Sequence, residues 1–261
     1  MRLLFIGDVV GRAGREGLTA TMPSLRERHK PDLVVVNGEN AAGGVGITEA
    51  TAKQIFDAGA QVITLGNHAY RQRESFGFLN ADERVIRPLN HSPESPGRGW
   101  ALVDAGGMKV AIVNLSGGVQ LQVERNPFTT MDELLPDLDG RADAVFVDFH
   151  AEVTSEKVAM GWFLDGRVAA VCGTHTHVPT ADARVLPGGT AHISDVGMTG
   201  SRDGVLGVER NEAIESLKTG LPVHFETANE NVWVMGCLVD INDAGLSTGI
   251  EQILEPVGQR P

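Results

Sequence analysis

The chain is organised around one stretch, Val171-Cys172-Gly173-Thr174-His175-Thr176-His177-Val178-Pro179, in which an apolar run ends in a turn with two histidines. Positions i and i+2 of extended backbone project to the same side, so His175 and His177 can present two imidazoles to one pocket. Imidazole is the commonest side-chain ligand for a metal ion. Because a His-x-His pair alone is a weak signal, its interpretation depends on the other strand ends of the chain.

Four other apolar runs also end in side chains that can bind a metal ion. They end in Asp8 after residues 3–7, Glu39 and Asn40 after 33–38, Asn67 and His68 after 62–66, and His150 after 144–149. The intervals between the first three ends are near the roughly 30 residues of one strand–helix–strand unit, which indicates a parallel sheet. Such a sheet is buried on both faces and places its site at the carboxyl ends of its strands. The strand ends therefore predict one shared metal site.

The order of the predicted elements indicates an α/β protein. Strands are predicted at residues 2–6, 33–36, 61–65, 100–104, 109–115, 144–150, 168–172, 190–194, 224–227, 231–240 and 248–254. Helices are predicted at residues 15–29, 48–58, 72–79, 132–138 and 209–218. A further helix is predicted from an N-cap at Thr154 or Ser155 to residue 164, and residues 195–207 are predicted to be a Gly-rich loop. We expect two sheets packed face to face with helices outside. Since no repeat, low-complexity tract or linker interrupts the chain, we expect residues 1–261 to form a single domain.

Composition limits the class of protein and its partners. An apolar content of 42% with 21% charged residues is ordinary for a globular protein, and the formal net charge of −12 argues against a basic face for long nucleic acid. Cys172 and Cys237 lie inside apolar runs and are expected to be buried thiols in a reducing cytoplasm. The chain lacks a signal-peptide pattern and any apolar stretch near the ~20 residues that span a bilayer. A small phosphorylated substrate, no membrane partner and a homo-oligomer are compatible with this composition.

The predicted site combines two carboxylates, two asparagines and several histidines. This set suits Mn²⁺, Fe, Zn²⁺ or Co²⁺, and it offers more donors than one tetrahedral ion requires, which favours a two-metal centre. Glu39 or Asp8 could bridge two ions because a carboxylate has two oxygens, whereas Asn40 could instead bond a backbone group. His68 follows a candidate ligand and is expected to lean over the site as a general acid. Asp148 has the wrong strand parity and is expected to be structural. The candidate ligands are Asp8, Glu39, Asn40, Asn67, His150, His175 and His177.

Five short motifs and four longer strings also give the sequence a family resemblance. The motifs are Gly7-Asp8, Gly38-Glu39-Asn40, Gly66-Asn67-His68, Asp148-Phe149-His150 and Gly173-Thr174-His175-Thr176-His177, and the strings are residues 5–11, 37–42, 150–157 and 195–200. The motifs resemble those of calcineurin-like metallophosphoesterases, and the strings resemble the bacterial YmdB family of cyclic-nucleotide phosphodiesterases. The resemblance runs from residue 1 to about residue 240. It implies a four-layer αββα sandwich with a dinuclear site of iron or manganese, with zinc and magnesium as further candidates.

The resemblance also implies how the ligands are divided. By this likeness, one ion is held by Asp8, Glu39 and His177 and the other by Glu39, Asn67, His150 and His175, while Asn40 contacts the first ion or phosphate and His68 serves catalysis. Three positions depart from the family pattern. Val10 stands where the wider superfamily has a histidine, and Glu39 where its bridging residue is usually aspartate. After Asn67 the branch is expected to have His-Thr-Trp-Asp, but residues 68–71 read His-Ala-Tyr-Arg. We expect Tyr70 to supply the aromatic wall of the site.

The first functional hypothesis is a metal-dependent phosphodiesterase for small phosphodiesters, above all 2′,3′-cyclic nucleotides. In this mechanism a metal-bridging hydroxide attacks phosphorus and His68 protonates the leaving ribose oxygen. The alternatives are a phosphomonoesterase or protein phosphatase, an amidohydrolase, and a regulatory metal-binding protein without turnover. An amidohydrolase would carry its His-x-His pair after the first barrel strand and not in the last third of the chain. An intact His68 beside a full ligand set argues against a protein without turnover.

Overall fold

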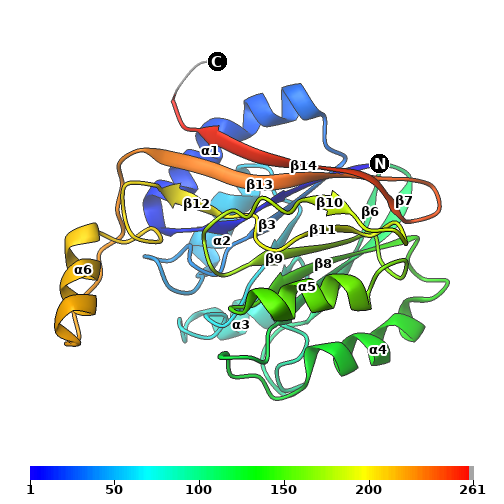
Figure 1. Ribbon diagram of the computed structural model, residues 1–261, viewed down its shortest axis with the longest axis horizontal. Coiled ribbons are helices and arrows are strands. Elements are labelled where there is room, and N and C mark those ends of the chain that lie inside the picture. Colours follow the sequence, from blue (N-terminus) through cyan, green and yellow to red (C-terminus); the bar gives the residue numbers. More distant parts are fainter. Residues whose placement is uncertain (259–261) are drawn as a thin grey trace.

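The computed structural model describes residues 1–258, which form two β-sheets packed face to face between layers of helices (Figure 1). The residues of β1, Arg2–Ile6, show why the sheets are stacked in this way. Leu3 and Phe5 lie in the core between the two sheets, whereas Leu4 and Ile6 lie in the core beneath the helices. Alternate side chains of a strand point to opposite faces, so a strand that is apolar throughout must be covered on both faces. The resulting four-layer αββα sandwich confirms the predicted fold class.

The first sheet carries the N-terminal strand ends. Its order is β2-β12-β13-β1-β3-β4-β5, with β14 paired to β13. Strands β1, β3, β4 and β5 run parallel, and β13 runs antiparallel to β1. The bounds are β2 Asp8–Val9, β3 Leu33–Asn37, β4 Val62–Thr64, β5 Val85–Ile86, β12 Met198–Ser201, β13 Val232–Ile241 and β14 Ser247–Pro256. The parallel register brings the ends of β1, β3 and β4 to one edge.

The second sheet has the order β10-β11-β9-β8-β7-β6. Strands β7, β8, β9 and β11 run parallel, and β6 pairs with β7 as the predicted hairpin. The bounds are β6 Trp100–Ala105, β7 Met108–Ser116, β8 Ala144–His150, β9 Ala170–Thr174, β10 Arg184–Val185 and β11 Ala191–Ile193. Gly106 and Gly107 form the tight turn of the hairpin with φ values of 57° and 80°, a backbone conformation that favours glycine.

Helices cover the outer face of each sheet. The first sheet is covered by α1 Gly11–His29, α2 Glu49–Asp57 and α3 Ser75–Ala81, and the second by α4 Pro127–Leu138 and α5 Thr154–Phe163. Helix α6 Arg210–Thr219 lies apart from these layers (Figure 1). The predicted cap at Thr48 is confirmed, because Thr48 and Thr51 form a reciprocal capping box at the start of α2.

The core between the sheets takes residues from both of them. Phe5 and Phe146 meet edge to face with their ring centroids 5.0 Å apart. Cys172 and Cys237 are buried free thiols, as predicted, and their sulfurs lie 3.5 Å apart across the same core. Because the two sheets share this core, we propose one domain for the chain; residues 259–261 of the predicted range lie outside the described part. No helix within residues 1–258 is long and apolar enough to cross a membrane.

Three sequence predictions about local structure are wrong. The predicted loop 195–207 contains the strand β12, whose Met198 pairs with Asp8 in parallel register. This long-range pairing could not be predicted because the segment is short and rich in glycine. Residues 224–227 are not a strand, and only an isolated bridge joins Thr227 to Val208. Helix α5 begins at Thr154 after an N-cap at Val153 without a side-chain capping bond, so neither predicted cap residue is used.

Candidate metal centre

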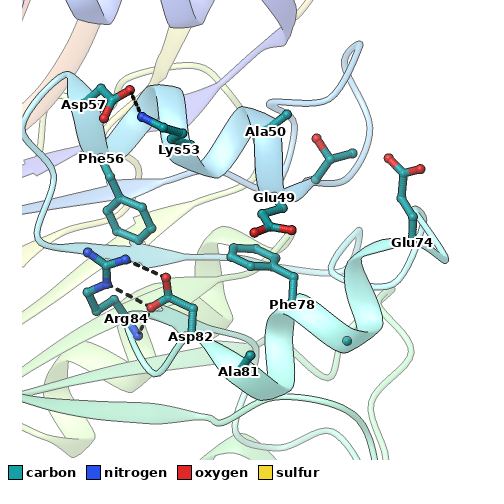
Figure 2. A pocket seen from close by; sticks show the side chains of 12 residues that line it. Glu49, Ala50, Lys53, Phe56, Asp57, Glu74, Phe78, Ala81, Asp82 and Arg84 are labelled. Atoms are coloured by element: carbon teal, nitrogen blue, oxygen red, sulfur yellow. Dashed lines mark hydrogen bonds and ion pairs between the residues drawn. The ribbon is translucent and has the colours of Figure 1, made fainter.

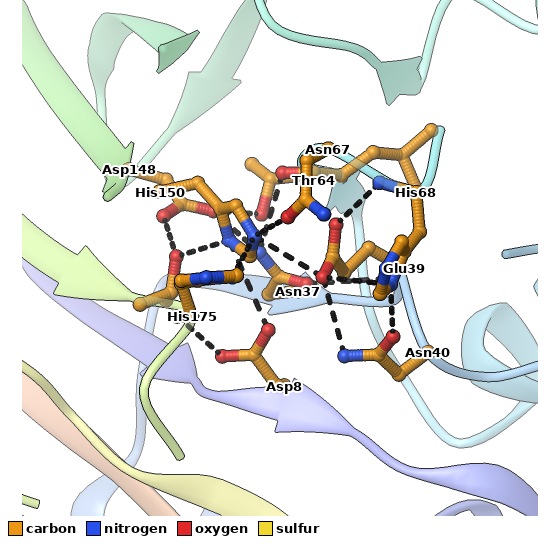
Figure 3. A network of polar contacts seen from close by, with 12 residues as sticks. Asp8, Asn37, Glu39, Asn40, Thr64, Asn67, His68, Asp148, His150 and His175 are labelled. Carbon is orange, nitrogen blue, oxygen red and sulfur yellow. Dashed lines mark hydrogen bonds and ion pairs between the residues drawn. The ribbon is translucent and has the colours of Figure 1, made fainter. Parts of the chain in front are cut away.

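The candidate ligands predicted from five strand ends meet between the carboxyl edges of the two sheets (Figure 3). The first sheet supplies the oxygen side of the centre, which we define as Asp8, Glu39, Asn40 and Asn67. The second sheet supplies the nitrogen side, defined as His150, His175 and His177. Parallel strands end at a common edge, so side chains that are far apart in sequence come together without long connecting loops.

His150 lies where the two sides meet. Its Nε2 atom is 2.9 Å from Oδ1 of Asn67, 3.1 Å from Oε1 of Glu39 and 3.0 Å from Nδ1 of His175. A single proton on Nε2 cannot satisfy three neighbouring acceptors at once. A cation among them would be bound by all of these atoms, and oxygen and imidazole nitrogen are the donors that such metals take in proteins. This cluster, with Glu39, His150 and His175 in mutual reach, fits a metal ion.

Asp8 indicates a second possible position for a cation, beside the one among Asn67, Glu39, His150 and His175. Its Oδ1 atom is buried and has no hydrogen-bond partner, although it lies 3.8 Å from Nε2 of His177 and 3.9 Å from Nδ1 of His150. Its other oxygen accepts a hydrogen bond of 3.2 Å from the backbone N–H of His175. A buried carboxylate oxygen without a partner is costly unless a cation compensates it. The geometry of Asp8 therefore also fits a metal ligand.

Hydrogen bonds on the outer side of His150 decide which nitrogen faces the centre. Its Nδ1 atom is 2.9 Å from the hydroxyl of Thr174, and that hydroxyl donates to Asp148 at 2.7 Å. Thr64 and Asn37 also donate to the Asp148 carboxylate. Because the Thr174 hydroxyl gives its proton to Asp148, it accepts from Nδ1–H of His150, and the lone pair of Nε2 is left for the centre. Asp148 has the structural role expected from its strand parity.

The other two histidines also have outer partners. Nε2 of His175 lies 3.0 Å from the carboxylate of Glu152, and Nδ1 of His177 donates to the carbonyl oxygen of Leu206 at 2.9 Å. These contacts leave Nδ1 of His175 and Nε2 of His177 for the centre. These partners were not predicted from the sequence. Nothing in the sequence distinguishes Glu152 from other acidic residues as a partner of His175, and any residue can supply a backbone carbonyl.

His68 and Asn40 form a separate pair at the edge of the centre. Nδ1 of His68 lies 2.8 Å from Oδ1 of Asn40 and 3.4 Å from Oε1 of Glu39, and a quarter of the His68 side chain is exposed. The Asn40 amide nitrogen donates to Glu39 at 3.2 Å and lies 3.1 Å from Nε2 of His177. The amide of Asn40 would therefore have to turn over to present its oxygen to an ion. His68 contacts the candidate ligands Asn40 and Glu39 through Nδ1, so its Nε2 atom is not used in these contacts.

The charges at the centre are strongly coupled. Burial opposes ionisation of Glu39, but His150 outweighs it and holds the pKa of Glu39 well below its usual range. Burial likewise works against a proton on His150, but Glu39 and Asp8 raise the pKa of His150 to about 9. Burial and the charge of His150 lower the pKa of His175 to about 3. One proton on His150 thus partly neutralises the carboxylates, a task that a cation would perform more completely, with release of that proton.

Gly66 keeps the centre open. A Cβ atom at this position would lie 2.3 Å from Oε2 of Glu39 and 2.4 Å from Nε2 of His150. Any other residue would therefore fill the space between the oxygen side and the nitrogen side. The backbone of Gly66 does not adopt a positive φ, so the need for glycine here comes from this space and not from the conformation of the chain.

Tyr70 does not have the contacts that its predicted role would suggest. Its hydroxyl donates to the carbonyl oxygen of Pro96 at 2.9 Å, and its ring packs edge to face against Phe76 and His91, each 5.8 Å away. These contacts are all to residues outside the oxygen and nitrogen sides. We infer that Tyr70 mainly packs the 91–96 segment against α3.

A separate hollow of about 1300 Å³ lies between α2 and α3 (Figure 2). Its cations are already paired within the hollow. Arg84 bonds Asp82 and stacks on Phe56 at 4.0 Å, and Lys53 bonds Asp57 at 2.6 Å. The candidate ligands are not part of its lining, so this hollow is not the predicted site.

Comparison with known proteins identifies the family of the chain. A family model described as YmdB-like protein matches residues 4–253. The chain is 46% identical over 255 residues to a Bacillus subtilis (strain 168) protein named 2′,3′-cyclic-nucleotide 2′-phosphodiesterase, with 97% of each chain covered. The structure is similar to that of a hypothetical protein from Thermus thermophilus, with a TM-score of 0.93, 38% identity, and coverage of 98% of this chain and 100% of that one.

Two further structures extend the comparison. A novel phosphatase from Mycoplasma pneumoniae aligns with a TM-score of 0.91 and 33% identity, over 99% of this chain and 95% of that one. A 5′-nucleotidase precursor from Thermus thermophilus aligns with a TM-score of 0.60 and 14% identity, over 98% of this chain and 54% of that one. The second similarity concerns the fold alone.

Proposed function

We propose that this chain, which belongs to the YmdB-like family, is a metal-dependent hydrolase of small phosphodiesters. The observation that carries the proposal is the crowding of Asn67, Glu39 and His175 around one nitrogen of His150, beside the unpaired oxygen of Asp8. Without a cation, one proton on Nε2 of His150 can bond only one of these neighbours at a time, whereas a metal ion would be bound by all of them. A regulatory protein without turnover is disfavoured because His68 lies beside the centre and its Nε2 atom is not used in the contacts with Asn40 and Glu39, so it can contact a substrate.

We propose two ions for this centre. Asp8, Glu39 and His177 would hold one, and Glu39, Asn67, His150 and His175 the other. Asn40 would contact a phosphate oxygen through its amide N–H while its oxygen stays bonded to His68, or it would turn over to contact the first ion. The mixed oxygen and nitrogen donors suit iron or manganese, with zinc or magnesium as substitutes. Two bound ions would supply Lewis acidity for the phosphoryl group and a nucleophile at neutral pH. Glu39 is the proposed shared carboxylate, because it lies 3.1 Å from His150 and the amide nitrogen of Asn40, which bonds Glu39, also lies 3.1 Å from His177.

His68 is the proposed general acid. Its contact with Asn40 Oδ1 uses the proton on Nδ1, so the ring is oriented and Nε2 can carry the proton that a leaving oxygen needs. The partly exposed ring lies outside the set of proposed ligands but within reach of it. A positioned acid of this kind contributes about 10²–10⁴-fold to the rate, provided that the leaving group is poor.

The substrate that we propose is a 2′,3′-cyclic nucleotide. The similarity to the Bacillus subtilis protein supports this class, and the chemistry agrees with it. A cyclic phosphate carries one negative charge and has a ribose hydroxyl as leaving group, which suits an acidic protein with a general acid. The similarity to the Mycoplasma pneumoniae phosphatase favours a phosphomonoester as the second candidate. Long RNA is disfavoured because the net charge of −12 provides no basic track for a backbone.

A cytoplasmic location is also proposed. Cys172 and Cys237 are unpaired and buried with their sulfurs only 3.5 Å apart, as expected for a protein in a reducing compartment. The proposal of a homo-oligomer is compatible with the exposed apolar side chains of Ile214 and Leu217 on α6.

The test combines elemental analysis with a substrate panel. Protein purified without chelator and supplied with Mn²⁺ or Fe²⁺ should approach two ions per chain, and chelation should abolish turnover. In the metal-replete enzyme, kcat/KM for 2′,3′-cyclic AMP should exceed that for 3′-AMP, 3′,5′-cyclic AMP and a phosphoserine peptide. A higher value for a monoester would change the assignment to phosphatase. A stoichiometry fixed at one would refute the two-ion centre.

A further inference from the structure

We infer that Asp195, backed by Lys157, is a positioning residue that holds the turn carrying His175 and His177 in the shape that metal binding requires. The inference rests on the proposed metal centre. Neither residue belongs to the oxygen side or the nitrogen side, and both are almost completely buried. Their effect is transmitted through Thr176, which lies between the two histidines.

The backbone of this turn is unfavourable by itself. His175 and His177 have φ values of 95° and 64°, in the left-handed region that residues with a Cβ atom rarely adopt. Two such residues separated by one position do not keep this conformation unless their surroundings hold it. The conformation departs from the extended backbone assumed for a His-x-His pair, and it directs Nδ1 of His175 and Nε2 of His177 to the centre.

Asp195 supplies the contacts that hold the turn. Its Oδ2 atom accepts hydrogen bonds from the backbone N–H of Thr176 at 3.1 Å and from the Thr176 hydroxyl at 2.7 Å. Its Oδ1 atom accepts from the backbone N–H of Gly197 at 2.8 Å, which fixes the direction of the carboxylate. One carboxylate therefore bonds both hydrogen-bond donors of the residue between the two histidines.

Lys157 offsets the free-energy cost of burying the carboxylate of Asp195. Its Nζ atom, which comes from α5, donates to Oδ2 of Asp195 at 2.7 Å. A buried carboxylate in an ion pair also needs its remaining acceptor positions satisfied, and Thr176 and Gly197 bond those of Asp195. The positive charge of Lys157 balances the negative charge of Asp195, so the pair holds the turn without adding net charge beside the centre.

The turn is seated closely on the segment that carries Asp195. The backbone N–H of Val196 donates to the carbonyl oxygen of Gly173 at 3.0 Å, and a Cβ atom at Gly173 would lie 1.8 Å from the carbonyl oxygen of Ser194. The end of β9 and residues 194–197 thus form a tight contact. A change in the direction of Asp195 would be passed on to the two histidines.

The experiment compares four variants with the wild type. Asp195→Asn keeps the shape of the side chain but removes its charge and one acceptor. Thr176→Val removes only the hydroxyl, and Thr176→Ser restores it. Asp165→Asn is the matched control, because Asp165 also accepts from two backbone N–H groups, those of Gly188 and Thr190, in another loop. Mn²⁺ affinity is measured by calorimetry, and hydrogen exchange of peptides that cover residues 174–178 is measured in the metal-free proteins.

We expect Asp195→Asn to weaken Mn²⁺ binding about 10- to 100-fold, the range found when groups that orient metal ligands are removed. Thr176→Val should weaken it less, Thr176→Ser should bind like the wild type, and exchange at residues 174–178 should accelerate in the same order. Asp165→Asn should change neither quantity. If Asp195→Asn fails to fold, the Val and Ser variants decide the question.

Wild-type affinity and exchange in Asp195→Asn, or in Thr176→Val, would overturn the inference and leave the proposed function intact. An equal loss in Asp165→Asn would show that any loop carboxylate has this effect, which would also overturn it. A wild-type protein that binds neither Mn²⁺ nor Fe²⁺ would refute the proposed function and, with it, the role of Asp195 in metal binding.

Discussion

The oxygen side and the nitrogen side of the centre are built in different ways. On the oxygen side, Glu39 is held mainly through backbone N–H groups: its Oε2 atom accepts from the backbone N–H of His68, and its own N–H donates to the side chain of Asn37. On the nitrogen side, each imidazole bonds a partner through the ring nitrogen that does not face the centre. These partners are Thr174 for His150, Glu152 for His175 and the carbonyl of Leu206 for His177.

The difference follows from the chemistry of the two kinds of donor. Either oxygen of a carboxylate can bind a cation, so a carboxylate has to lie at the right position but needs no hydrogen bond to select one of its atoms. An imidazole has one suitable nitrogen at a time, and an outer hydrogen bond has to select it. Changes within the space that the two sides share should therefore abolish metal binding, whereas changes at the outer partners should weaken it by degrees.

The largest effect is expected where the two sides meet. Gly66→Ala would place a methyl group 2.3 Å from Oε2 of Glu39 and in the space around Nε2 of His150. We expect the variant to lose metal and turnover together, because both sides would have to move apart. Elemental analysis after incubation with Mn²⁺ and the thermal midpoint of the metal-free protein are the measurements.

Gly77→Ala is the matched control, because nothing lies within 4 Å of a Cβ atom at this position in α3. It should keep the metal content of the wild type and be at least as stable, since alanine is the better helix former. Full metal content in Gly66→Ala would show that the donors do not converge as closely as the structure indicates.

The second effect separates chemistry from metal binding. His68 stands next to the oxygen side and is proposed to hold a proton, not an ion. His68→Ala should keep its metal while kcat falls ~10²–10⁴-fold on a diester with a poor leaving group. The loss should shrink on a nitrophenyl ester, whose leaving group needs no proton. Metal loss would make His68 a ligand, and equal losses on both substrates would remove it from the role of acid.

The oxygen side was the easier part to predict from the sequence. Asp8, Glu39 and Asn67 each follow a short apolar run directly, and the spacing of these runs indicates parallel strands whose ends share an edge. The same reasoning places His150. In all these cases the position of a side chain depends on the strand that precedes it, and the sequence of that strand is local information.

The nitrogen side shows what the sequence did not contain. The histidines at 175 and 177 were predicted as ligands, but on the assumption of extended backbone and not of the left-handed turn. That turn depends on Asp195, which lies in a segment predicted to be only a Gly-rich loop. Contacts between segments that are distant in sequence, such as the pairing of β12 with β2, leave no periodic pattern from which they could be inferred.

The third effect tests whether outer partners act through the imidazole they touch. Thr174 and Thr64 are both buried and both donate to Asp148, but only Thr174 also contacts His150. Thr174→Val should weaken Mn²⁺ binding about tenfold or more, because Nδ1 of His150 loses its partner. Thr64→Val should lower the stability of the protein and leave the affinity almost unchanged. Equal losses of affinity would mean that Asp148, and not the bond to His150, controls the site.

The smallest effect is expected at Glu152, because it is the exposed one of the two side-chain partners, whereas Thr174 is buried. Glu152 accepts from Nε2 of His175 at 3.0 Å, but its side chain is 44% exposed, so water can replace it. Because the pKa of His175 is about 3, this contact is a hydrogen bond from a neutral imidazole, and we expect it to contribute no more than an exposed ion pair, about 0–1 kcal/mol or at most about a fivefold change in affinity. Glu152→Ala should therefore weaken Mn²⁺ binding only a few-fold, and Glu152→Gln, which keeps an acceptor oxygen, still less. Calorimetry alongside Thr174→Val gives the comparison directly. A loss as large as that of Thr174→Val would show that the choice of nitrogen, and not the burial of the partner, determines how strongly each histidine is held.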